Sequence, residues 1–343
     1  MNQMTTYAGE QSGYKRRGIG VNAAVTAGEE LLELLEFPLQ EFGIYRIDFD
    51  GIRCPEPGGL WVVDFFNASG EKNYADNYSL LYPSAERAAS QTAFFMARAE
   101  AVRGTLGVRS QGGELQIGYV QLQTAAKDEA LAWMDAVASE FPDIAPSLHL
   151  NPGRWRYLPR TLDKLKRGET IRVAALGDSI SNDMLNGLGH LLVERAYPGA
   201  ELQIVHANGP EKACDNYKHE EVLERLVTRH HPDLLTVGGM SHKAEDIRSV
   251  IRNVRRMYGD IEAVYFDIRV NSDPESSMCD LDALKEMARE DEFDIFDMTT
   301  PYLDCVNRSG YPLSWFSRDD EHANDRGKQL LARIFAAYFD AGS

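Results

Sequence analysis

The chain has 343 residues, and 43% of them are hydrophobic, which is enough to bury a core in each of two domains. Its formal net charge of −17 argues against nucleic acid as a partner, because binding to a polyanion depends on Lys and Arg neutralising phosphates. The sequence contains no apolar stretch of about 18 residues or more, so we expect no membrane-spanning segment.

Residues 1–20 are polar and Gly-rich, and we expect them to form a loose lead-in. The first seven residues lack the charged and apolar segments of a signal peptide. A cytoplasmic location is therefore expected, with a secreted or periplasmic location as the alternative if a leader was trimmed away. The four cysteines show no close pairing along the chain and are expected to be free thiols.

Residues 21–145 consist of short apolar runs separated by turn residues, followed by a helical pattern. Runs 43–51 and 114–122 alternate apolar and polar residues with a period of two, which indicates half-buried strands. Further strands are expected at 60–66 and 92–99. Several short strands at this spacing predict an antiparallel β-sandwich, which resembles a jelly roll and ends in an amphipathic helix.

Aromatic residues are frequent in the predicted sandwich. They could form a surface on which sugars stack, or they could fill the core, since half of each strand faces inward. These residues are Trp61, Phe65, Phe66, Tyr74, Tyr78 and Tyr82. A linker is expected at 146–160, where Pro and Gly residues follow the helix.

Strands and helices alternate over residues 161–343. The strands are expected at 171–176, 202–206, 234–238, 263–268 and 293–297, and helices between or after them include 243–258, 281–290 and 328–339. This rhythm predicts a doubly wound parallel sheet with helices on both faces. Functional groups should then gather at the carboxyl ends of the strands.

Ser179 follows the first of these strands, in the stretch Gly177-Asp178-Ser179-Ile180-Ser181. A serine on a strand-to-helix turn presents its hydroxyl at the edge of the sheet, beside the positive end of the next helix. Ser179 is therefore a candidate nucleophile. The alternative is that Asp178, Ser179 and Ser181 only cap the helix.

A candidate base and its partner lie near the end of the chain. Asp319 precedes His322 by three residues, just ahead of the last helix. That spacing lets the carboxylate accept a hydrogen bond from Nδ1 of the imidazole while Nε2 faces a serine. One element would then supply both the general base and the group that orients it.

These two motifs, about 140 residues apart and in this order, resemble those of the SGNH, or GDSL, hydrolase superfamily over roughly residues 160–343. The resemblance implies a flavodoxin-like hydrolase domain and a serine esterase without a cofactor. Ser179 would be the nucleophile, His322 the base and Asp319 the third member of the triad. The N-terminal region resembles the jelly-roll modules of some carbohydrate esterases in the superfamily, which implies an O-acetyl carbohydrate ester as substrate.

The same resemblance implies an oxyanion hole formed by the N–H groups of Ser179 and Gly209, although Gly209 could also belong to a simple Asn-Gly turn. The third block departs from the family. Where the family has Gly-x-Asn-Asp, this chain has Gly239-Met240-Ser241-His242. Either Ser241 replaces the asparagine as a donor, or His242 reaches in, or the hole has two donors.

Two other functions remain open: a lipid esterase or thioesterase, and a non-catalytic glycan-binding protein of the same fold. The chain has no Cys-x-x-Cys or His-Glu-x-x-His pattern, so no metal site is expected. Asn182 and Asp183 are interpreted as ordinary residues of the first turn of a helix. The sequence indicates nothing about the oligomeric state.

Overall fold

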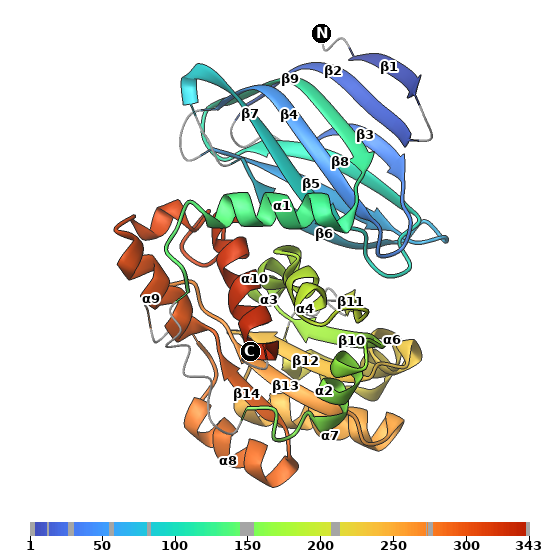
Figure 1. The fold of residues 1–343 in the computed structure, drawn as a ribbon, viewed down its shortest axis with the longest axis vertical. Helices are drawn as coiled ribbons and strands as arrows, with labels where there is room; N and C mark the ends of the chain where they lie inside the picture. Colours follow the sequence, from blue (N-terminus) through green and yellow to red (C-terminus); the bar gives the residue numbers. More distant parts are fainter. Residues whose placement is uncertain are drawn as a thin grey trace. The chain divides into compact units, whose positions relative to one another are not determined.

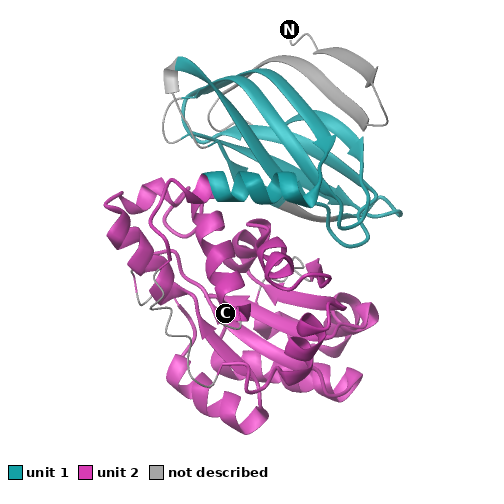
Figure 2. Ribbon diagram, viewed as in Figure 1, with its two compact units in different colours: residues 1–136 teal, residues 137–343 magenta. Residues whose placement is uncertain are grey.

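The computed structural model describes residues 4–11, 14–26, 31–54, 58–80, 84–144, 154–206, 213–271, 273 and 277–340. The chain divides into two compact units, residues 1–136 and residues 137–343 (Figure 2). Most of the linker expected at 146–160 lies outside the described residues. All four cysteines, Cys54, Cys214, Cys279 and Cys305, are free.

The first unit is a β-sandwich of two antiparallel sheets, as predicted (Figure 1). One sheet has the order β1-β2-β9-β4-β7 and the other the order β3-β8-β5-β6. The strands are β1 (Met4–Gln11), β2 (Tyr14–Thr26), β3 (Leu32–Pro38), β4 (Ile44–Cys54), β5 (Gly59–Phe66), β6 (Lys72–Ser79), β7 (Ser84–Met96), β8 (Arg103–Ser110) and β9 (Glu114–Thr124). Helix α1 (Lys127–Ala138) follows the last strand.

Most of the described aromatic residues of the sandwich belong to its core. Trp61 stacks on Tyr78 with ring centroids 4.0 Å apart, and both side chains are buried. Phe65 is buried as well, whereas Phe66 is half-buried beneath the guanidinium of Arg103. Tyr82 and the side chain of Tyr74 lie outside the described part of the chain. The core interpretation therefore holds for Trp61, Phe65 and Tyr78.

Residues 1–20 contain strand β1 and the start of strand β2, where we had expected a loose lead-in. The two strands pair antiparallel, with Met4 opposite Val21, and β2 also pairs with β9. These ladders consist of backbone hydrogen bonds, which require no apolar side chains. A polar, Gly-rich segment therefore joins the sheet without the alternating pattern that would reveal it in the sequence.

The second unit is an α/β domain around a parallel sheet with the order β11-β10-β12-β13-β14 (Figure 1). The strands are β10 (Thr170–Gly177), β11 (Glu201–His206), β12 (Leu234–Gly239), β13 (Glu262–Asp267) and β14 (Asp294–Asp297). Counted along the chain, the order is 2-1-3-4-5, which is that of flavodoxin-like sheets. The predicted doubly wound fold is confirmed.

Helices cover both faces of this sheet. They are α2 (Pro159–Lys166), α3 (Ser179–Asn186), α4 (Gly189–Ala196), α5 (Cys214–Tyr217), α6 (Glu220–Leu226), α7 (Ala244–Tyr258), α8 (Leu281–Asp291), α9 (Thr299–Ser309) and α10 (Asp325–Phe339), with 3-10 turns at Thr228–His230 and Leu313–Trp315. Residues of α5, α6, α7 and α8 share one apolar core with Leu176, Leu235 and Tyr265 of the strands. On the other face, Phe335 of α10 packs against Phe266 of β13.

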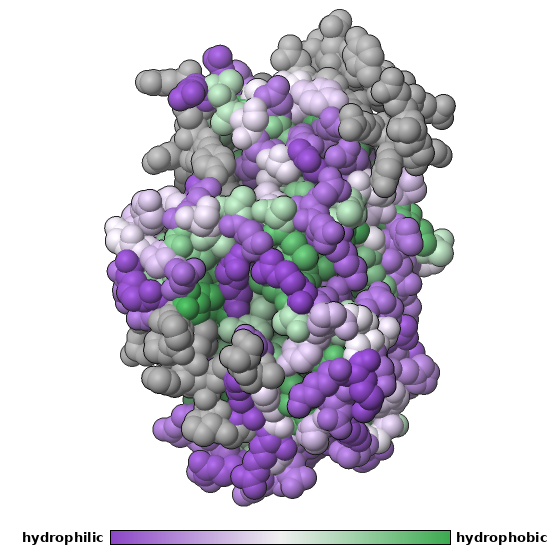
Figure 3. Space-filling view, viewed as in Figure 1, coloured by the Kyte–Doolittle hydropathy of each residue, from purple (hydrophilic) through white to green (hydrophobic). Residues whose placement is uncertain are grey.

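On the face drawn in Figure 3, hydrophilic residues are the most frequent among the coloured ones, with smaller hydrophobic patches between them. None of the described helices combines the length and the apolar character that a membrane span requires.

Candidate active site

Ser179 lies where the parallel sheet reverses its strand order. Strand β10 pairs with β11 on one side and with β12 on the other, and it ends at Gly177. The crevice beyond the carboxyl ends of such neighbouring strands is the usual ligand site of doubly wound sheets. Ser179 is the first residue of α3 and is half-exposed, whereas the other residues of that helix are buried. The serine is thus the accessible residue of its helix.

Gly177 lets the chain turn tightly from strand β10 into helix α3. A Cβ atom at this position would lie 1.9 Å from Oγ of Ser181 and 2.6 Å from the carbonyl oxygen of Gly238. No side chain fits there, because these distances are far below van der Waals contact. The carbonyl oxygen of Gly177 accepts a hydrogen bond of 2.9 Å from the hydroxyl of Tyr217, which fixes the end of the strand.

Asp178 connects the turn that carries Ser179 to the loop after β12. Its Oδ1 accepts hydrogen bonds from the backbone N–H groups of Ile180 (3.0 Å) and Ser181 (3.2 Å), which caps helix α3. Its Oδ2 accepts from the N–H groups of Met240 (2.8 Å) and Ser241 (3.0 Å). One buried carboxylate therefore holds both loops in place.

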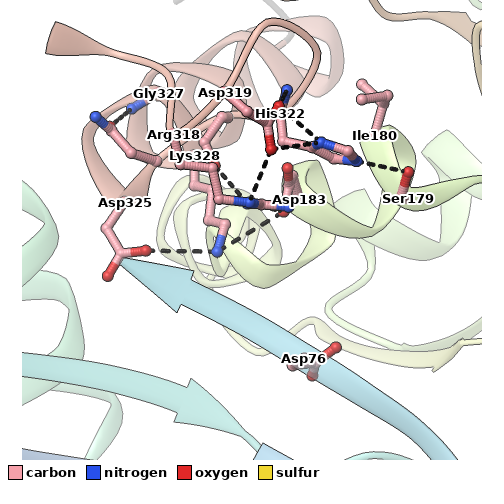
Figure 4. A network of polar contacts seen from close by, with 12 residues as sticks. Asp76, Ser179, Ile180, Asp183, Arg318, Asp319, His322, Asp325, Gly327 and Lys328 are labelled. Carbon is pink, nitrogen blue, oxygen red and sulfur yellow. Dashed lines mark hydrogen bonds and ion pairs between the residues drawn. The ribbon is translucent and has the colours of Figure 1, made fainter. Parts of the chain in front are cut away.

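Ser179, His322 and Asp319 form one hydrogen-bonded row (Figure 4). Oγ of the serine lies 2.9 Å from Nε2 of the imidazole. Nδ1 of the same ring lies 2.8 Å from Oδ1 and 3.0 Å from Oδ2 of Asp319. A carboxylate only accepts hydrogen bonds, so Nδ1 carries the proton and Nε2 is free to accept the serine proton.

The loop that carries His322 and Asp319 is closed by its own backbone. Oδ1 of Asp319 accepts hydrogen bonds from the N–H groups of Glu321 (2.9 Å) and His322 (2.7 Å). Burial by itself raises the pKa of Asp319, but these bonds and the imidazole outweigh it and lower the pKa to about 2. The carboxylate is therefore ionised throughout the neutral range and orients the ring.

The residues predicted for the oxyanion hole are only partly described. Gly209 lies outside the described residues. Ser241 is described, and its N–H group donates to Asp178. His242 is buried: its Nδ1 accepts from the N–H of Cys214 (3.2 Å), and its Nε2 donates to the carbonyl oxygen of Gly238 (2.9 Å). The ring of His242 thus supports the loop, and the alternative that it reaches into the site is not met.

The side chain of Asp183 has a different environment from the one we expected. It is not an ordinary first-turn residue, because its buried carboxylate forms an ion pair of 2.9 Å with Arg318, the residue before Asp319. Sequence reasoning missed this pair. The only signals were an acid four residues after the serine and a cation adjacent to the Asp-x-x-His motif. Neither is distinctive, since both residue types are usually solvated.

Asp267, at the carboxyl end of β13, is a buried acid outside the Ser-His-Asp row. Its Oδ1 has no hydrogen-bond partner among the described residues, and its Oδ2 lies 3.4 Å from Oγ1 of Thr299. Burial raises the pKa of Asp267 to about 6, and the nearby charge of Asp297 acts in the same direction against the opposing charge of Arg269. The folded protein therefore holds this proton more tightly than the unfolded chain does.

We expect Asp267→Asn to flatten the pH dependence of stability. In the wild type, this group makes no unfavourable contribution below the unfolded pKa of about 4, and its penalty grows as pH rises toward the folded pKa of about 6. Between pH 4 and pH 8 the difference should be about 2 kcal/mol in the free energy of unfolding, measured in urea. Asp282→Asn, at an exposed acid, is the control. An unchanged pH dependence in Asp267→Asn would contradict the assignment.

Fold and site together define an α/β domain that carries a hydrogen-bonded Ser-His-Asp row at the carboxyl edge of its sheet. No family model matches the chain, and neither does any curated protein. Similar solved structures include a two-domain esterase active on acetylated mannans, at 16% identity and a TM-score of 0.46, covering 57% of this chain and 56% of that chain. This chain thus spans about half the length of that esterase.

Two further solved structures resemble parts of the chain. A protein from Lactobacillus plantarum is 13% identical, with a TM-score of 0.33, and the match covers 50% of this chain and 98% of that chain. A xylan-binding domain from Paenibacillus barcinonensis is 9% identical, with a TM-score of 0.22, and the match covers 37% of this chain and 86% of that chain.

Proposed function

We propose that this protein is a serine esterase of the SGNH, or GDSL, type, which hydrolyses an O-acetyl ester on a carbohydrate. The observation that carries the proposal is the row of Ser179, His322 and Asp319, with 2.9 Å from the serine Oγ to Nε2 and 2.8 Å from Nδ1 to the carboxylate. A serine becomes a useful nucleophile only when a base removes its proton, and the base acts best when a third group fixes its tautomer.

In the proposed reaction, Oγ of Ser179 attacks the ester carbonyl carbon while Nε2 of His322 takes the serine proton. The tetrahedral intermediate collapses, the bond to the alcohol oxygen breaks, and His322 returns the proton to the leaving alcohol. Water then attacks the acyl-enzyme with His322 again as base, which releases the carboxylic acid and restores Ser179. Asp319 stays ionised and stabilises the imidazolium at both stages.

The N-terminus of α3 is the proposed place for the developing oxyanion. The N–H groups of Ile180 and Ser181 are already engaged by Asp178, whereas that of Ser179 lies outside this cap. The Ser179 N–H and the helix dipole would stabilise negative charge there. The resemblance adds the N–H of Gly209, and the hydroxyl of Ser241 is the proposed third donor.

The proposed substrate class follows from the resemblance and from the order of the two units. Acetylated carbohydrate is proposed because the β-sandwich that precedes the α/β domain resembles the jelly-roll modules of some carbohydrate esterases in this superfamily. An enzyme for long acyl chains would instead need an apolar channel beside the nucleophile. A glycan-binding protein without activity would need none of the proton transfers described above.

We expect the protein to cleave p-nitrophenyl acetate faster than the butanoate and octanoate esters, as measured by kcat/KM. Acetate release from acetylated and chemically deacetylated oligosaccharides would then test the carbohydrate part, with the deacetylated sample as the matched control. Faster cleavage of octanoate would favour the lipid esterase or thioesterase instead. Absence of turnover with every ester would refute the esterase proposal and favour glycan binding.

A further inference from the structure

Asp183 projects from the helix that begins at the nucleophile. It follows Ser179 by four residues, one turn further along α3, so both residues lie on the same side of the helix. Its side chain is 2% exposed. A buried carboxylate in this place requires a cation, because an unpaired buried charge costs several kcal/mol.

Arg318 supplies that cation from the loop that carries the proposed base. Its Nη1 donates to Oδ1 of Asp183 at 2.9 Å and to the carbonyl oxygen of Ala323 at 2.6 Å (Figure 4). Its backbone N–H donates to the carbonyl oxygen of His322 at 3.0 Å. The guanidinium of Arg318 therefore binds the backbone of its own loop at Ala323 and also links that loop to α3 through Asp183.

The arginine also lies beside the acid of the triad. Its Nε is 3.9 Å from Oδ2 of Asp319, the next residue in the chain. Nζ of Lys328, from α10, lies 3.7 Å from Oδ1 of Asp183 and 3.4 Å from Oδ1 of Asp325. Cations from two elements thus face the carboxylate of Asp183.

Such an arrangement is poorly explained by stability alone. Replacing a buried ion pair by apolar residues of similar volume is often neutral or stabilising, because the desolvation of two charges offsets their attraction. The N–H donors of a guanidinium lie in one rigid plane, so an arginine fixes the direction from which its partners bind as well as supplying charge. The geometry that it fixes here is the position of the His322 loop relative to Ser179.

We propose that Arg318 and Asp183 form a positioning pair, which sets the distance between the imidazole of His322 and the hydroxyl of Ser179. The role rests on the proposed esterase function and adds two residues to it. Both side chains are buried, so the proposed role requires no contact with the substrate. The pair acts through the loop: a displacement of about 1 Å in a catalytic group lowers the rate on the order of a hundredfold.

The kinetic test compares Arg318→Gln, Asp183→Asn and the double variant with the wild type on p-nitrophenyl acetate. We expect each single variant to lose about 10- to 100-fold in kcat with KM changed by less than about twofold, because substrate contacts stay intact. The kcat of the double variant should not fall below that of the slower single variant, because both substitutions break the same interaction and their effects are not additive. Arg318→Lys, which keeps the charge but loses the planar donors, should fall between Arg318→Gln and the wild type.

Arg256→Gln is the matched control, because Arg256 forms an exposed ion pair with Glu220 at 2.6 Å on the surface of α6 and α7. It should leave kcat unchanged. Arg318 variants with wild-type kcat, or with losses only in KM, would overturn the positioning role. So would additive losses in the double variant.

Hydrogen exchange separates this proposal from the esterase proposal, because it requires no turnover. In Arg318→Gln the N–H groups of Glu321 and His322 should exchange at least tenfold faster than in the wild type, while those of α7 stay unchanged. If the wild type were inactive, the esterase proposal would be refuted. The exchange rates would still test whether the positioning pair holds the His322 loop. Unchanged exchange in the loop would overturn the positioning pair even in an active enzyme.

Discussion

Ser179→Ala is expected to lower kcat on p-nitrophenyl acetate by at least about ten-thousand-fold and to leave the circular dichroism spectrum unchanged. The loss should be this large because no covalent intermediate can form without Oγ, and His322 then has no hydroxyl to activate. The fold should persist because Ser179 is half-exposed and the capping of α3 depends on Asp178 instead. The measurement is initial-rate kinetics on protein purified side by side with the wild type.

Ser249→Ala serves as the control for this experiment. Ser249 is another helical serine, and its hydroxyl donates to the carbonyl oxygen of Glu245 at 2.7 Å on the surface of α7. Its removal should not change kcat. A Ser179→Ala protein that keeps more than a tenth of the wild-type rate would show that Ser179 is not the nucleophile.

Gly239→Ala should destabilise the protein more than Ser179→Ala or Asp267→Asn does, and it should also remove activity. Gly239 has a φ of +118°, and a Cβ there would lie 2.1 Å from Oδ1 of Asp178. Backbone strain and the displaced carboxylate should together cost about 3 kcal/mol, a decrease in Tm of roughly 6 to 12 °C for a unit of this size. Differential scanning calorimetry measures the effect.

Gly259→Ala separates the two causes. Gly259 has nearly the same φ, +113°, but a Cβ at that position meets no atom within 4 Å. It should therefore show the cost of the backbone conformation alone and keep full activity. If both variants lost the same stability and Gly239→Ala stayed active, the contact with Asp178 would not matter.

The fold could be anticipated from the sequence because its strands follow local patterns. The pairing of His322 with Ser179, 143 residues away, was anticipated only because the two motifs together resemble those of a known superfamily. Strands β10 and β12 are short runs in which apolar residues predominate, and the three-residue spacing of Asp319 and His322 brings these two side chains together. The pair of Asp183 and Arg318 could not be anticipated in this way. Its partners are 135 residues apart, and only the packed fold reveals that both are buried.

The loop after β12 shows a second limit of sequence reasoning. We compared Ser241 and His242 as side chains that might replace an asparagine. In the structure, the N–H of Ser241 and the ring of His242 act as supports of the loop, through Asp178 and Gly238. A comparison of motifs matches residue types and does not show which backbone N–H groups are already engaged in hydrogen bonds.

The carboxylate of Asp178 holds the loop after β12 through the main-chain N–H groups of Met240 and Ser241, so this support does not depend on the side chains at those two positions. Substitutions at residues 240 and 241 therefore leave both of these main-chain donors in place. A library varied at these two positions, with Asp178 and Gly239 kept, would therefore vary the surface of this loop while its main-chain support is retained.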